Sequence, residues 1–193
     1  MLDQYQTIET EGIAEVVEKK SRFIGMIAPA ATQEEAEAYI EKIRKKHYDA
    51  RHHCFAYVTG EAGTPGEIQR FSDDGEPQGT AGKPMLEVLR GYELHNTVVV
   101  VTRYFGGTLL GTGGLLRAYT KAAQDAYAAA GVVKKQSGVR MSVKCSYTAS
   151  GKLTWYFANE NITVLRTDYG EGVEIQLLIP DGEVEKVRNQ ITE

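Results

Sequence analysis

Residues 96–131 have the sequence NTVVVVTRYFGGTLLGTGGLLRAYTKAAQDAYAAAG, and this stretch decides the fold. Its first part, Asn96 to Phe105, is dense in β-branched residues at consecutive positions, which is typical of a central strand covered on both faces. A glycine-rich loop follows, and the alanine-rich segment Leu115 to Ala130 ends at Gly131, a common residue after a helix C-terminus. The sequence therefore predicts a buried strand, a loop and a long helix at the centre of a first domain.

The segments before this stretch alternate between strand and helix patterns. Residues rich in Val and Ile flank Lys19-Lys20-Ser21, which predicts a hairpin with a tight polar turn. Apolar residues at helical spacing follow Thr32, a good N-cap, and a second helix is expected near Gly82. The expected elements are strands at 13–18, 22–28, 52–59 and 68–71, and helices from Thr32 to about Lys46 and from Gly82 to about Gly91.

Beyond Gly131 the composition changes, and KKQSG at 134–138 is the expected linker. The elements expected after it are a strand at 139–147, a helix capped by Thr148 or Ser150, strands at 163–169 and 173–179, and a helix capped by Asp181. This β-α-β-β-α order is typical of a ferredoxin-like sandwich. We therefore predict an α+β protein of two domains, residues 1–133 and residues 138–193.

Composition sets limits on function. The chain has 42% hydrophobic and 25% charged residues, as a folded globular protein does, and its net charge of -4 gives no overall attraction for nucleic acid. Binding of RNA would therefore need a local basic patch. Cys54 and Cys145 form no Cys-x-x-Cys unit, and the longest aliphatic block, 98–101, is too short to cross a bilayer. We expect a cytoplasmic protein with reduced cysteines and no membrane partner.

The segment 72–84, SDDGEPQGTAGKP, has three carboxylates among glycines and prolines. The side chains of Asp73, Asp74 and Glu76 have the oxygen ligands that a divalent cation such as magnesium prefers, and carboxylates also act as acids and bases. The same residues are good turn formers whose side chains bond their own backbone. This structural role is the favoured interpretation of the acidic loop.

The glycine-rich loop between strand and helix suggests an anion site. Glycines let a ligand approach the backbone closely, and the free amides of a helix N-terminus favour a negative charge. Alternatively the glycines allow tight packing and the arginines form surface ion pairs. The candidate phosphate- or RNA-binding residues are Arg103, Gly106, Gly107, Gly111, Gly113, Gly114, Arg117 and, from the acidic loop, Lys83.

Base stacking, metal binding and cysteine chemistry have less support from the sequence than an anion site. Tyr104 and Phe105 adjoin the glycines and could stack on bases, although core aromatics are commoner. His52 and His53 point to opposite faces of a strand, so no metal site is expected there. Cys54 has no activating motif, and no catalytic residue is assigned.

The combination of SDDGEPQGTAGKP with NTVVVVTRYFGGTLLGTGGLL resembles the signature of the IMPACT family, called YigZ-like in bacteria. The resemblance covers about residues 15 to 130, and the second domain resembles the smaller C-terminal domain of the bacterial members. It implies a first domain similar to domain 2 of ribosomal protein S5 and a second similar to the ferredoxin-like domain V of elongation factor G. The eukaryotic relatives are regulators of translation, and no catalytic activity is established for the family.

We therefore expect a translation-associated regulatory or binding protein rather than an enzyme. Residues 72–116 are expected to form its functional surface and to contact RNA or a ribosome-associated protein. The alternative is an enzyme or binding protein for a phosphorylated or nucleotide-like small molecule. In that alternative the acidic loop holds magnesium and the glycine-rich loop holds phosphate. Otherwise no cofactor is expected. A third interpretation is an assembly module that pairs through the second domain.

Overall fold

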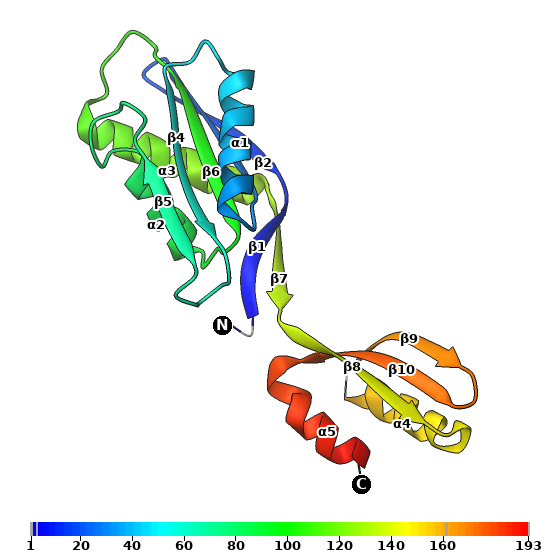
Figure 1. The fold of residues 1–193 in the computed structure, drawn as a ribbon. Coiled ribbons are helices and arrows are strands. Elements are labelled where there is room, and N and C mark those ends of the chain that lie inside the picture. Colours follow the sequence, from blue (N-terminus) through cyan, green and yellow to red (C-terminus); the bar gives the residue numbers. More distant parts are fainter. Residues whose placement is uncertain (1, 3, 161, 193) are drawn as a thin grey trace. The chain divides into compact units, whose positions relative to one another are not determined.

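The computed structural model describes residues 2, 4–160 and 162–192. The chain divides into two compact units, Met1–Lys135 and Gln136–Glu193 (Figure 1). In chain order the elements are β1 (Gln4–Thr10), β2 (Gly12–Glu18), β3 (Ser21–Pro29), α1 (Gln33–Lys46), β4 (His52–Thr59), β5 (Ile68–Ser72), α2 (Gly82–Gly91), β6 (Thr97–Tyr104), α3 (Gly111–Ala129), β7 (Gly131–Gln136), β8 (Gly138–Cys145), α4 (Tyr147–Asn159), β9 (Thr163–Tyr169), β10 (Val173–Pro180), the 3-10 helix η1 (Asp181–Glu183) and α5 (Val184–Thr192). The α+β architecture of two domains is confirmed.

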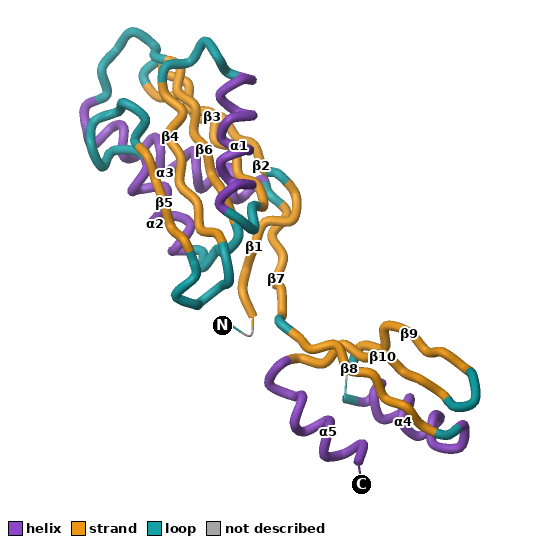
Figure 2. Tube along the Cα trace, viewed as in Figure 1, coloured by secondary structure: helices purple, strands orange, loops and turns teal. Residues whose placement is uncertain are grey.

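The first unit is a layered structure around an antiparallel sheet. Its five strands have the order β2-β3-β6-β4-β5, and a separate pair joins β1 to β7. Helix α1 covers one face of the large sheet, while α2 and α3 cover the other (Figure 2). The glycine-rich loop connects the end of the middle strand, β6, to the exposed first turn of α3.

Strand β6 is buried on both faces, as its run of valines predicts. Val99 and Val101 pack in the core beneath α2 and α3, whereas Val98 and Val100 pack in the core beneath α1. All four are 0% exposed. This alternation explains why β-branched residues occupy consecutive positions, since each face of the strand supplies a different hydrophobic core.

Helix α3 lies unusually close to the sheet because glycines stand beneath it. A Cβ atom added to Gly25 of β3 would lie 2.3 Å from the carbonyl oxygen of Ala122. One added to Gly12 of β2 would lie 2.2 Å from the carbonyl oxygen of Ala126. The alanines of α3 and the glycines of the sheet therefore form a matched contact that fixes the position of the helix.

The second unit has the expected β-α-β-β-α order. Its antiparallel sheet has the order β8-β10-β9, and its core includes Phe157 of α4, Ile175 and Leu177 of β10, and Val187 of α5. Consecutive helical positions face different directions, and accordingly Trp155 is 71% exposed while Phe157 is 0% exposed.

Several local predictions were wrong. Strand β1 lies in a polar N-terminal segment, and β7 replaces most of the predicted linker. Both are strands of a two-stranded pair and lack the long apolar pattern of a central strand. Helix α3 begins at Gly111 rather than Leu115, so it includes three glycines that intrinsic propensity disfavours. Ser146 caps α4, since its Oγ accepts from the Ala149 amide at 3.3 Å. In the described part of the chain, no helix has the length and hydropathy needed to span a bilayer.

The contact between α3 and the sheet can be tested by substituting Gly25→Ala. The new methyl group meets the Ala122 backbone, so we expect a loss of about 1–3 kcal/mol in the free energy of unfolding, as for other overpacked sites. Urea unfolding followed by circular dichroism measures this loss. Gly91→Ala is the matched control, because beyond its chain neighbours and the backbone of its own helix no described atom lies within 4 Å of the added Cβ. Equal stability of the two variants would contradict the close packing.

Candidate nucleic-acid interface

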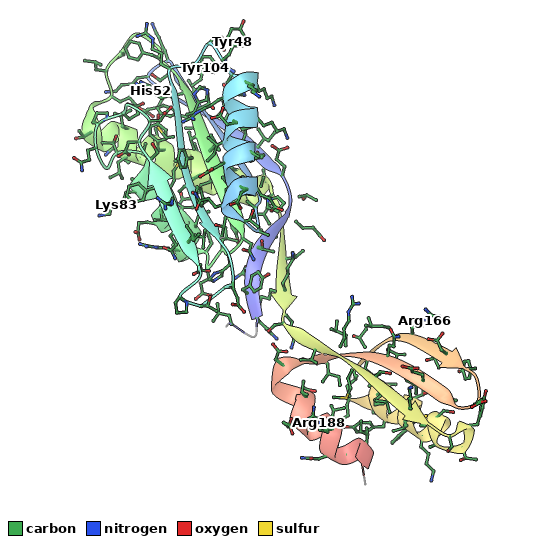
Figure 3. The ribbon with its side chains drawn as sticks, viewed as in Figure 1. Tyr48, His52, Lys83, Tyr104, Arg166 and Arg188 are labelled. Carbon is green, nitrogen blue, oxygen red and sulfur yellow. The ribbon has the colours of Figure 1, made fainter. Side chains whose placement is uncertain are left out.

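One end of the five-stranded sheet brings three connections together. Strand β6 ends at Tyr104, and the neighbouring strands β3 and β4 begin beside it. The connections that meet there are the Lys19-Lys20 turn, the segment 47–51 after α1 and the glycine-rich loop 105–110, and we call them together the tip. Figure 3 shows Tyr48 and Tyr104 close to each other at this end of the first unit.

Arg103 lies beneath the tip and inside the protein. Its side chain is 7% exposed, and its Nη1 donates to Oε1 of Glu76 at 2.7 Å. The hydroxyl of Tyr119 donates to the same carboxylate oxygen at 2.8 Å. Nη2 of Arg103 lies 3.5 Å from Oγ of Ser21, while Nε is buried and has no hydrogen-bond partner among the described residues. The guanidinium is therefore engaged within the unit, and its role as a phosphate ligand stays a prediction.

Two further polar groups complete this buried cluster. Burial raises the pKa of Tyr119 well above its usual value, and the neighbouring Cys54 and Glu76 raise it further. Burial likewise raises the pKa of the Cys54 thiol, whose Sγ donates to the carbonyl oxygen of Asp73 at 3.0 Å. Both groups therefore stay protonated at neutral pH. Arg103 and Glu76 are left as the charged pair of this cluster.

Asp73 organises the acidic loop and the start of α2. Its Oδ1 accepts from the amides of Ala81 at 3.0 Å and Gly82 at 2.8 Å, and its Oδ2 accepts from the amide of Gly79 at 2.8 Å. Amides at a helix N-terminus have no partner within the helix, so this carboxylate provides their hydrogen-bond acceptor. Its negative charge also interacts favourably with the positive end of the helix dipole.

Asp74 and Glu76 are also bound by groups of the chain. Oδ2 of Asp74 accepts from the His53 amide at 2.7 Å, and its Oδ1 lies 3.3 Å from Nη2 of Arg44. Glu76 pairs with Arg103, as described above. A magnesium ion in this loop would have to displace these donors. The magnesium alternative stays a prediction, and no hydrogen bond or ion pair of the loop favours it.

The glycine-rich loop packs directly on the lysine turn. A Cβ atom at Gly106 would lie 2.0 Å from the carbonyl carbon of Lys20, so only glycine fits at this position. The Gly106 amide also donates to Oγ of Ser21 at 3.1 Å. At the other end of the loop, the first turn of α3 has neither a side-chain cap nor an acidic residue. Its amides and the positive end of its dipole face outward from Gly111.

The three predicted cations do not converge on one point. Arg117 is exposed on α3 and lies beside the first turn of the helix, with its Nη1 3.8 Å from a Cβ position at Gly113. It lines a hollow of about 440 Å³ together with Gly114 and Glu18. Lys83 instead lines a groove between α2 and α3, and Figure 3 shows it apart from Tyr104. Arg117 thus belongs with the glycine-rich loop, whereas Lys83 does not reach the tip.

The two aromatic residues before the glycines differ in their surroundings. The hydroxyl of Tyr104 donates to Asp49 at 2.9 Å and lies 3.0 Å from Nδ1 of His47, so this side chain ties β6 to the segment after α1. Phe105 is 56% exposed and makes no such connection. Of the two, Phe105 has the more accessible ring.

Sequence reasoning missed Lys19 and Lys20 as site residues. Both are exposed, and neither has a hydrogen bond or ion pair among the described residues. Both also have positive φ values, 46° and 68°, as in a two-residue hairpin turn of type I′. Such turns favour Asn-Gly, so two lysines at these positions were a signal that the sequence already contained. The sequence alone could not link these lysines to a site, because the glycine-rich loop lies against their turn only in the folded chain.

Fold and site together define an α+β protein of two domains, with an uncapped glycine-rich helix start and a lysine turn on its first domain. Comparison with known protein families also finds two domains. The Impact N-terminal domain matches residues 19–127, and a domain of unknown function, DUF1949, matches residues 143–193. Because the first match spans more than half of the chain, the chain belongs to the IMPACT family.

The relatives extend this similarity over nearly the whole length. The IMPACT family member YvyE of Bacillus subtilis is 41% identical over 193 residues, which is 100% of this chain and 88% of the relative. The IMPACT family member YigZ of Escherichia coli is 40% identical over 86% of this chain and 81% of the relative. A crystal structure described as that of a hypothetical protein is 33% identical, with a TM-score of 0.69 over 99% of this chain and 92% of that chain.

The buried ion pair beneath the tip can be tested with Glu76→Gln. The substitution leaves the Arg103 guanidinium buried without a counter-charge, so we expect a loss of about 3–5 kcal/mol in the free energy of unfolding. The control is Glu87→Gln, because Glu87 also pairs with an arginine at 2.8 Å but at the surface. It should change stability by about 1 kcal/mol or less in the same denaturant titration. Similar effects of both substitutions would contradict the structural importance of the buried pair.

Proposed function

We propose that this protein is a translation-associated binding protein whose first domain contacts the phosphates of RNA through the tip. The observation that carries the proposal is the placement of three exposed cations, Lys19, Lys20 and Arg117, around the glycine-rich loop, with no ion pair among the described residues. Unpaired cations grouped in this way are the electrostatic footprint of a polyanion site.

The local charge differs from that of the whole chain. Although the net charge is -4, the carboxylates of the acidic loop are bound by backbone amides and by arginines. Lys45 and Lys46, just before the segment 47–51, and Arg51 within it add further exposed positive charge at the tip. Glu18 and Asp49 are the opposing acids near it. This balance supports phosphate binding at the tip despite an acidic protein overall.

Membership of the IMPACT family supplies the biological setting. The eukaryotic relatives implied by the resemblance are regulators of translation, and RNA is the polyanion that a translation-associated protein meets. A ribosome-associated protein partner would not require cations to surround a loop of exposed glycines. RNA phosphates fit both features, since they approach backbone amides closely and pair with lysine and arginine.

The proposal predicts that binding and stability respond oppositely to one double substitution, Lys19→Asn with Lys20→Gly. Asn-Gly is the favoured sequence of a type I′ turn, so we expect the melting temperature to rise by about 2–4 °C, for roughly 1 kcal/mol of relieved strain. Loss of two phosphate contacts should weaken RNA binding about tenfold and lower the slope of log K against log salt by about 1–2. Fluorescence anisotropy with labelled RNA measures both quantities.

The matched control is an adjacent lysine pair of the first unit that lies outside the tip, Lys134 and Lys135 of β7. Both are exposed, and β7 pairs with β1 rather than with a strand that reaches the tip. The same double substitution there changes charge equally and should leave affinity and salt slope within about twofold of the original protein. If the two double variants bind RNA alike, the tip is not the binding surface.

A further inference from the structure

Phe105 is a large aromatic side chain that the core does not absorb. It is 56% exposed, although it follows a strand whose four valines are fully buried. Gly106, directly after it, is held against the backbone of Lys20. The backbone on both sides of Phe105 is therefore fixed, and the exposed ring is not part of a loosely placed loop.

The ring of Phe105 is also supported from within. The guanidinium carbon of Arg103 lies over this ring at 5.5 Å and over the ring of Phe23 at 5.4 Å. Phe23 is fully buried, so Arg103 is held between an inner ring and an outer ring. Its position is fixed further by Glu76. The Phe105 ring thus lies against an immobilised cation, while more than half of the residue is exposed to solvent.

An open aromatic face beside unpaired cations has a specific ligand chemistry. Unpaired nucleobases stack on aromatic rings while their phosphates pair with neighbouring lysines and arginines. In duplex RNA the base faces are already stacked on each other and offer no face to Phe105. Tyr104 is a poorer platform, because its hydroxyl is bonded to Asp49 and the Arg22 guanidinium lies over its ring at 5.6 Å.

We propose that Phe105 is a stacking platform for an unpaired nucleobase, so the tip selects single-stranded over double-stranded RNA. This inference rests on the proposed function and adds the class of RNA. Arg103 acts through Phe105 as a positioning residue, since its planar guanidinium supports the ring from behind. Lys19, Lys20 and Arg117 hold the phosphates on either side of the stacked base.

The test compares an unstructured single strand with a duplex of the same length, using anisotropy. Phe105→Leu should weaken binding of the single strand about tenfold, the order expected for loss of one base–aromatic stack, and leave duplex binding unchanged. Phe105→Tyr retains an aromatic face and should retain affinity. Leu109→Ala is the control, because Leu109 is 82% exposed in the same loop but has no ring. It should not change the preference for single strands.

A second measurement observes the stacked ring directly. The chain has one tryptophan, Trp155 in the second unit, so Phe105→Trp combined with Trp155→Phe places the only indole at the tip. Single-stranded RNA should quench its fluorescence, and a duplex at equal saturation should not. Arg103→Lys in this background removes the planar support and should reduce the quenching at saturation, a readout that a general loss of stability does not produce in a folded variant.

The outcomes separate the two proposals. If the unchanged protein binds neither RNA, the proposed function fails. If it binds both RNAs equally and Phe105→Leu changes neither affinity, the stacking inference is overturned while the phosphate contacts of the proposed function stand. A tenfold loss confined to the single strand supports both. Because Phe105 is exposed, its substitution is informative even if Arg103→Lys does not fold.

Discussion

The ion pair between Arg103 and Glu76 joins three parts of the first unit that are distant in sequence. Arg103 comes from the central strand, Glu76 from the acidic loop, and Tyr119 of α3 donates to the same carboxylate. Burying two charges is costly, so the pair itself adds little net stability, but neither partner tolerates loss of the other. The Glu76 amide donates to the carbonyl oxygen of Asp73 at 2.9 Å, and the Asp73 carboxylate in turn accepts from the amides at the start of α2. The strand, the loop and both helices on this face therefore depend on one contact.

The same contact separates the charges of the site into an inner and an outer set. The carboxylates of the acidic loop turn inward to amides and arginines, which reduces the negative charge that they present at the tip. Lys19, Lys20 and Arg117 have no such partners among the described residues and remain in solvent. A chain with a net charge of -4 thus presents a basic surface locally. The surface is basic because acidic side chains are bonded within the protein, not because basic residues are in excess.

The elements that depend on local pattern could be predicted from the sequence, and those that depend on partner choice could not. Consecutive valines predicted that β6 is covered on both faces, because that pattern has few other solutions. In contrast, Arg103 looked like a surface phosphate ligand. Its inward direction follows from Glu76, a partner 27 residues away that no local pattern identifies. Strand β7 was missed for the same reason, since its pairing with β1 spans most of the first unit.

The lysine turn is the clearest case in which local rules disagree with the residues present. A type I′ turn disfavours β-carbon-bearing residues other than Asn and Asp, and at these two positions the chain has lysines with φ values of 46° and 68°. No hydrogen bond or ion pair of either lysine, within the described residues, offsets this strain. The fold gains nothing from the charges, yet the backbone of Lys20 lies against Gly106, in the loop that exposes Phe105. Strain of this kind is typical of functional positions, and here it places charge where a phosphate-bearing ligand would need it.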